Sequence, residues 1–130
     1  MKKTELLHAE ISEIIAKSAH GDMIMIGDAG MPVPEGVKFI DLALTEGMVP
    51  FFDVLDAVLK ELCVEEAYID LELKDNEEYY NEMYIHADKI KINEMKHEEL
   101  KEMSKNCLAA IRTGEFTPYS NIILKSGVVF

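Results

Sequence analysis

The feature that most limits the fold of this chain is a run of four apolar residues, M-I-M-I, at positions 23–26. One Gly-Asp pair precedes the run and another follows it, so residues that favour turns fix both of its ends. A short run that is apolar at every position, rather than at every second one, is typical of a strand covered on both faces. The sequence therefore predicts a buried strand here.

The spacing of apolar residues along the rest of the chain predicts an alternation of helices and strands. In chain order we expect a helix around 7–15, strands at 23–26 and 37–44, a helix at 50–62, a strand at 66–73, a short helix at 76–84, a strand at 89–93, a helix at 97–112 and a terminal hairpin at 122–130. This order favours an α/β fold with layers around a mixed sheet. Since no linker, repeat or low-complexity tract interrupts the chain, we expect a single domain over residues 1–130.

Charge and composition argue against several kinds of partner. The formal net charge is −12 at pH 7, which disfavours nucleic acid and anionic membrane surfaces. No apolar run reaches the ~18–20 residues that a membrane helix needs. Three polar residues near the N-terminus interrupt the apolar segment that a signal peptide requires: Glu5, His8 and Glu10. We therefore expect a cytoplasmic protein in which Cys63 and Cys107 are reduced.

Common motifs for nucleotides, acyl transfer and metals are absent. The sequence contains no P-loop, no G-x-G-x-x-G and no G-x-S-x-G. Its four histidines lack the spacing of metal ligands, so we expect no dedicated metal site.

Two chemically active residues flank the predicted strand at 23–26. His20 lies where the first helix is expected to end, and there it either interacts with the helix dipole or acts as a general acid or base. Asp28 either forms a turn with Gly27 and Gly30, or holds a hydroxyl group or orients a nearby imidazole. Residue type alone leaves both alternatives open for each residue.

Two later segments also carry polar groups. His97 opens a predicted helix and fits a position near its cap, and Lys101, four residues on, shares its face and is a further candidate. The segment 112–121, R-T-G-E-F-T-P-Y-S-N, combines hydroxyl, amide and aromatic groups around a glycine and a proline. Such a loop suits a polyhydroxylated ligand with Tyr119 as an aromatic platform, or it is only a tight polar connection.

Several segments resemble a known family. They are A-H-G-D, I-G-D-A-G-M-P-V-P, I-D-L-A-L-T-E-G, K-H-E-E-L-K and R-T-G-E-F-T-P-Y-S-N-I-I-L-K-S-G-V-V-F. On these segments the chain resembles the RbsD/FucU family of sugar mutarotases from its first residue to its last, least closely over about 70–95. The resemblance implies a layered α/β/α fold with a mixed central sheet.

The resemblance also implies an activity and a set of site residues. Family members interconvert sugar ring forms without a cofactor. The T-P-Y-S-N and S-G-V-V-F segments look closer to the ribose branch, which converts β-pyranose D-ribose to the β-furanose form and would supply ribokinase after ribose import. By resemblance the catalytic proton donor is His20. The residues implied to bind the sugar are Asp28, His97, Tyr119, Ser120 and Asn121.

The same resemblance implies self-association into rings of subunits, commonly decamers, with sites near subunit interfaces. Two other functions stay open: a mutarotase for L-fucose or another monosaccharide, and a non-catalytic sugar-binding module. A mere binder has no need of a proton shuttle, so His20 together with Asp28 and His97 argues against the second alternative.

Overall fold

The structure is a computed structural model that describes residues 1–130. The elements in chain order are α1 (Ala9–Lys17), β1 (Met23–Gly27), β2 (Lys38–Asp41), α2 (Phe51–Leu59), β3 (Val64–Asp70), a short 3₁₀ helix η1 (Leu71–Asp75), α3 (Glu77–His86), β4 (Lys91–Met95), α4 (His97–Ser104), β5 (Ala109–Arg112) and β6 (Ile122–Ser126).

The six strands form one mixed sheet in the order β2-β5-β1-β6-β3-β4. β6 is antiparallel to both of its neighbours, β1 and β3, whereas the other three pairs are parallel. Five strands therefore point the same way and β6 points the opposite way. The apolar run at 23–26 lies in β1, between β5 and β6, so the predicted buried strand is confirmed.

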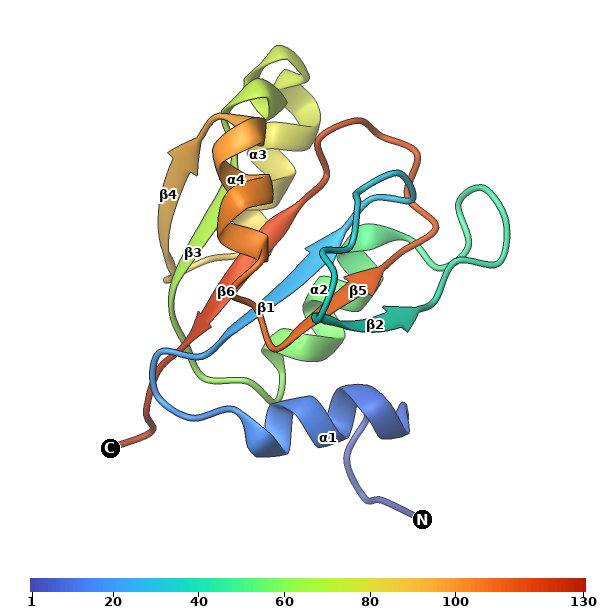
Figure 1. Cartoon of the computed structure of the whole chain (residues 1–130), viewed down its shortest axis with the longest axis vertical. Helices are drawn as coiled ribbons and strands as arrows, with labels where there is room; N and C mark the ends of the chain where they lie inside the picture. The colour runs from blue at the N-terminus through green and yellow to red at the C-terminus, as the bar shows by residue number, and fades with distance from the viewer.

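Helices cover both faces of this sheet. Successive residues of β1 point to opposite faces, so Ile24 and Ile26 pack in one core cluster and Met25 packs in another. The first cluster includes Phe51 of α2 and lies under α1, α2 and α3, and the second includes Leu100 of α4. Figure 1 shows α4 in front of the sheet and α2 and α3 behind it. The expected layered α/β/α fold with a mixed sheet is confirmed.

The start of α2 follows from local chemistry. Pro50 occupies the N-cap, where its missing N–H leaves no hydrogen bond unmade. Phe51, Val54, Leu55 and Val58 then recur at helical spacing, and all four are buried against the sheet. None of the helices has both the length and the apolar character that crossing a bilayer requires.

Two predictions for the last third of the chain are wrong. The helix expected at 97–112 ends at Ser104, and Ala109–Arg112 forms β5 between β2 and β1. The hairpin expected at 122–130 is also absent, because Ile122–Ser126 pairs with β1 and β3 and no strand follows it. In both places a short apolar run is compatible with more than one structure: a helix or a strand at 109–112, and a hairpin or a central strand at 122–126. Pairing with strands far away in the sequence decides which structure forms.

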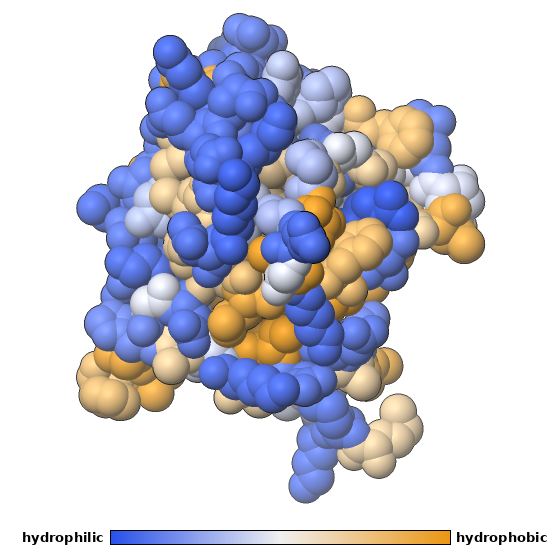
Figure 2. All heavy atoms as spheres, viewed as in Figure 1, coloured by the Kyte–Doolittle hydropathy of each residue, from blue (hydrophilic) through white to orange (hydrophobic).

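Most of the surface is hydrophilic, but apolar residues are exposed in a few places. Figure 2 shows apolar groups at the corner where the chain ends and on the loop between β2 and α2. The most exposed of them are Leu44 and Met48 on that loop and Val129 and Phe130 at the C-terminus. These groups are available to cover a partner surface.

Candidate active site at the carboxyl edge of the sheet

The topology gathers polar residues at one edge of the sheet. Asp28 follows β1, Asp70 ends β3 and His97 follows β4, so all three lie at the carboxyl ends of strands that run the same way. The antiparallel β6 begins at this edge, directly after Asn121. In open α/β sheets, ligands bind beyond the carboxyl ends of the strands.

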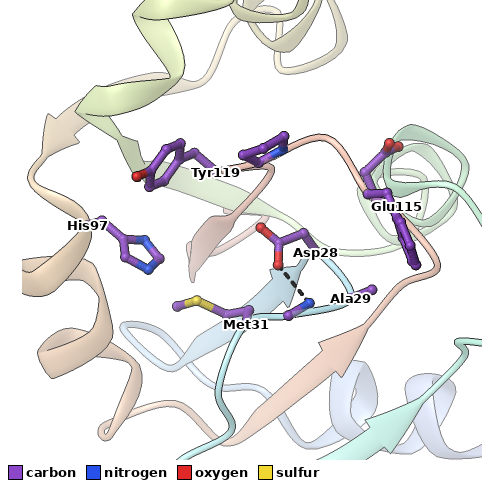
Figure 3. Close-up of a pocket in the computed structure, with 9 residues that line it drawn as sticks. Asp28, Ala29, Met31, His97, Glu115 and Tyr119 are labelled. Atoms are coloured by element: carbon purple, nitrogen blue, oxygen red, sulfur yellow. Dashed lines mark hydrogen bonds between the residues drawn. The ribbon is translucent and has the colours of Figure 1, made fainter. Parts of the chain in front are cut away.

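A pocket of about 510 Å³ opens at this edge (Figure 3). Its volume lies within the ~300–1,000 Å³ of typical small-molecule sites. Figure 3 shows Asp28, His97 and Tyr119 around one hollow, each from a different segment of the chain. The lining residues are Asp28, Ala29, Gly30, Met31, His97, Glu115, Phe116, Pro118 and Tyr119.

Asp28 has the turn role that its neighbours suggested, and it also lines the pocket. Its Oδ1 accepts the backbone N–H of Gly30 at 2.9 Å, and its own N–H donates to Oδ1 of Asn121 at 2.9 Å. Burial raises the pKa of Asp28, and hydrogen bonds from the backbone of Gly30 and Met31 oppose that rise. The carboxylate is therefore fixed in direction and only partly removed from water.

His97 is held by two carboxylates. Its backbone N–H donates to both oxygens of Glu72, at 3.2 and 3.0 Å, which anchors the start of α4. Its ring Nδ1 lies 3.0 Å from Oδ2 of the buried Asp70. The other ring nitrogen, Nε2, has no partner within the chain, so it is free to meet a ligand in the pocket.

Tyr119 stands at a strained point of the 113–121 loop. Its φ of 66° lies in the left-handed region, which residues other than glycine rarely adopt. The loop is held by hydrogen bonds of its own, among them Thr117 N–H and Oγ1–H donating to Glu115 Oε2. The Tyr119 ring meets the His97 ring edge-on, with centroids 5.3 Å apart. Strain of this kind gathers at functional sites, where the surrounding structure enforces it.

Ser120 and Asn121 lie behind the pocket rather than in its wall. Both are fully buried. The hydroxyl of Ser120 donates to the carbonyl of Thr117 at 2.7 Å. Asn121 Nδ2 donates to Asp70 Oδ2 at 2.7 Å, while its Oδ1 accepts from Asp28. The side chains of this pair support the residues that line the pocket.

His20 lies at the other edge of the sheet. It precedes β1, whereas Asp28 follows it, and a strand of five residues spans ~16 Å. Its Nε2 is 2.9 Å from Oε2 of Glu65, and 60% of its side chain is exposed. It borders a hollow with Val128 and Phe130 of the C-terminus. Within one chain, His20 and Asp28 do not share a pocket.

Lys101 is also outside the pocket. Its Nζ pairs with Oε1 of Glu98 at 3.2 Å, and the side chain borders a shallow hollow between α4 and Pro32. Sharing a helix face with His97 does not bring Lys101 to the ring, because His97 is turned toward β3 by Asp70.

Asp70, which links His97 to Asn121, is not among the site residues predicted from the sequence. Asp70 ends the strand V-E-E-A-Y-I-D, which already contains two glutamates, so an acid there does not stand out in the sequence as Asp28 does after its apolar run. The pocket also uses Met31, Glu115 and Phe116, which spacing alone did not single out. No group of three or more His, Cys, Asp or Glu side chains is placed to hold a metal ion.

The fold and the pocket together define a small α/β protein with a polar site for a small molecule at the carboxyl ends of its strands. The model of the RbsD / FucU transport protein family matches residues 1–129. The chain therefore belongs to this family.

Two curated relatives and two solved structures show which members of the family this chain resembles. A D-ribose pyranase of Coprothermobacter proteolyticus is 53% identical, and one of Thermoanaerobacter sp. is 52% identical, each over 100% of both chains. The structure of Bacillus subtilis RbsD complexed with D-ribose matches with a TM-score of 0.96 and 41% identity over 100% of both chains. A fucose mutarotase of Streptococcus pneumoniae in complex with L-fucose matches with a TM-score of 0.76 and 26% identity over 95% of both chains.

Proposed function

We infer that this chain is an isomerase that interconverts the β-pyranose and β-furanose forms of D-ribose, as a D-ribose pyranase does. The observation that carries this function is the full-length match, at a TM-score of 0.96, to a relative complexed with D-ribose. Full-length identity above 50% to relatives named D-ribose pyranase supports the same substrate. The fucose mutarotase is more distant in both sequence and structure, which makes L-fucose the second candidate.

The reaction breaks one C–O bond and forms another, and it asks the enzyme only for proton transfers. Opening the pyranose ring removes a proton from the anomeric hydroxyl, breaks the bond between C1 and the ring oxygen to leave an aldehyde at C1, and delivers a proton to the released oxygen. Closing the chain through the C4 hydroxyl forms a bond between that oxygen and C1, while the hydroxyl loses its proton and the aldehyde oxygen gains one, which gives the furanose. Positioned acids and bases contribute ~10²–10⁴ to the rate of such steps. Holding the open-chain aldehyde in one orientation adds to this.

The groups that line the pocket are suited to binding the sugar. We propose that the carboxylate of Asp28, Nε2 of His97 and the phenol of Tyr119 bind sugar hydroxyls, since all three residues line the pocket. Ser120 and Asn121 would support the sugar-binding residues without touching the sugar, because their side chains already form hydrogen bonds inside the protein. Lys101 has no support from the geometry, since it pairs with Glu98 outside the pocket.

We propose that the proton donor, His20, enters this pocket from a neighbouring subunit. An exposed imidazole at the edge of the sheet opposite to Asp28 is suited to a site formed between copies of the chain. A head-to-tail contact of this kind generates a ring when the rotation closes. The resemblance to the family favours a ring of ten subunits that acts in the cytoplasm on imported ribose.

Proton NMR of D-ribose tests the function directly. Exchange between the pyranose and furanose signals should be much faster with the protein than without it, and His20→Ala should remove about 10²-fold or more of that acceleration. His86→Ala is the matched control, because His86 pairs with Asp56 and stacks on Phe52 outside the pocket.

Each alternative function has its own outcome in this assay. Faster exchange of L-fucose than of D-ribose would favour the fucose mutarotase. Saturable binding of ribose without faster exchange would favour a sugar-binding module. Unchanged exchange in His20→Ala would remove His20 from the mechanism.

A further inference from the structure

Asp70 is a carboxylate buried behind the pocket. It ends β3, has no exposed surface and does not line the hollow that Figure 3 shows. A carboxylate removed from water is costly unless new hydrogen bonds replace the lost hydration. Only Oδ2 has partners, whereas Oδ1 is buried without any. Since Asp70 is only half satisfied, packing alone does not account for a charged residue at this position.

Both partners of Oδ2 belong to the candidate site, and the first of them is Asn121. Its Nδ2 donates to Oδ2 at 2.7 Å, and its Oδ1 accepts the backbone N–H of Asp28 at 2.9 Å. Turning this amide over would place its NH₂ against the Asp28 N–H and its oxygen against Asp70, so both bonds would become repulsive. Asp70 therefore fixes the amide that holds Asp28.

The second partner is the ring of His97, whose Nδ1 lies 3.0 Å from the same oxygen. The ionised carboxylate of Asp70 can only accept hydrogen bonds, so Nδ1 carries the proton of this contact. The neutral ring then keeps a lone pair on Nε2, the nitrogen with no partner inside the chain. A sugar hydroxyl can donate to that lone pair.

We propose that Asp70 is a positioning residue: through one oxygen it sets the tautomer of His97 and the orientation of Asn121, and so determines what the pocket offers to a sugar. This role deepens the proposed function and rests on it. Asp70 itself does not touch the ligand. Without its carboxylate, His97 would populate both tautomers, and the one with its proton on Nε2 could no longer accept from the sugar hydroxyl.

The variant Asp70→Asn keeps the size of the side chain and removes the charge. We expect its KM for D-ribose to rise about tenfold, the effect of one lost hydrogen bond, with a smaller change in kcat. A structural defect could also raise KM, so the decisive readout is the ¹⁵N spectrum of the His97 ring at a pH where it is neutral. His97→Asn assigns these signals by their loss. The wild type should show Nδ1–H, and Asp70→Asn a mixture or Nε2–H.

Ser104→Ala is the matched control. Ser104 is a similarly buried polar residue on α4, but its hydroxyl donates to the carbonyl of Lys101 and forms no hydrogen bond with His97 or Asn121. It should leave both KM and the His97 tautomer as in the wild type.

Three results would separate the possibilities. A wild-type His97 with its proton on Nε2 would overturn the proposal, and this measurement needs no variant that might fail to fold. A folded Asp70→Asn with unchanged KM and tautomer would overturn it as well. A wild type that leaves ribose exchange unchanged, but shows the Nδ1–H form that Asp70→Asn loses, would contradict the proposed function and support the positioning role.

Discussion

At the scale of single residues, the candidate site contains acids that the fold makes harder to ionise. Burial is the main cause that raises the pKa of both Asp28 and Asp70, and the hydrogen bonds to each only partly oppose it. A carboxyl whose pKa is higher in the folded than in the unfolded state favours folding at low pH. That contribution is lost as the pH rises through the folded pKa. At neutral pH these acids therefore cost stability, which is typical of residues kept for function.

The first prediction concerns Asp28→Asn. The amide can still accept the Gly30 N–H through Oδ1, but it has no charge to desolvate. We expect the variant to be about 0.5–1 kcal/mol more stable than the wild type at pH 7 and to lose most of the acceleration of ribose exchange. The stability difference should shrink as the pH falls toward the ordinary pKa of 3.8. Urea unfolding at several pH values measures it.

Glu66→Gln is a control at a carboxylate whose pKa is lowered rather than raised, so the expected change in stability has the opposite sign. Hydrogen bonds from Lys125, Tyr68 and Asn93 lower the pKa of Glu66 to about 2, so its contribution to stability is full above pH 4.5 and is lost as the pH falls from there through the folded pKa of about 2. Its replacement should destabilise the protein at pH 7 and leave ribose exchange unchanged. If Asp28→Asn also proved less stable at pH 7, the turn rather than the desolvated charge would dominate at Asp28.

At the scale of elements, the sequence predicts those segments whose own residues decide their structure. The M-I-M-I run gives β1, and Pro50 followed by a helical stripe gives α2. β5 has the sequence A-A-I-R, in which alanine favours helices, and it becomes a strand only because β1 and β2 pair with it. β6 likewise depends on partners that are far away in the sequence. No local pattern contains that information.

The same limit applies to the candidate site. Asp28, His97 and Tyr119 were predicted to bind the sugar, and the structure brings all three to one pocket. Neither periodicity nor resemblance suggested Asp70, because its role depends on β3 lying beside β6, so that the end of one strand meets the start of the other. The position of His20, by contrast, follows from the predicted strand itself, because residues before and after a strand lie at its two ends.

The prediction at this scale concerns the end of β1, where the sheet and the pocket loop approach closely. A Cβ on Gly27 would lie 2.8 Å from Cβ of Met31 and 3.0 Å from Oδ1 of Asn121. Gly27→Ala should therefore lower the free energy of unfolding by about 1–3 kcal/mol, and the displaced Asn121 should weaken ribose binding. The midpoint of urea unfolding and a ribose titration measure the two effects.

Gly30→Ala is the control for this close approach. It lies on the same loop, but its Cβ would come no nearer than 3.6 Å to another group, Oδ1 of Asp28, which is ordinary contact. Its stability should stay close to that of the wild type. Equal losses in the two variants would show that backbone freedom in this loop, rather than crowding at Gly27, sets the cost.

At the scale of the whole molecule, the chain carries candidate functional residues at two opposite edges of its sheet. The pocket with Asp28 opens at the carboxyl edge of the sheet, and the exposed His20 lies at the opposite edge beside the apolar C-terminus. Copies packed head to tail would bring one edge against the other and would cover apolar residues such as Val129 and Phe130. With this arrangement every site would draw its residues from two chains.

The last prediction tests whether each site takes its residues from two chains, by mixing two variants that we expect to be inactive alone. His20→Ala keeps the pocket and lacks the proposed proton donor, whereas Asp28→Asn keeps that donor and lacks a proposed sugar ligand. If each site joins the pocket of one subunit to His20 of the next, random co-assembly in equal amounts gives intact sites at about a quarter of the interfaces. Co-expression with two different tags, purification for both and the ribose exchange assay should then recover about a quarter of the wild-type acceleration. Replacing the Asp28→Asn chain by the double variant His20→Ala, Asp28→Asn should recover none, because no chain then supplies a histidine. Mixed oligomers as inactive as their parents would mean that His20 does not serve the pocket of a neighbour.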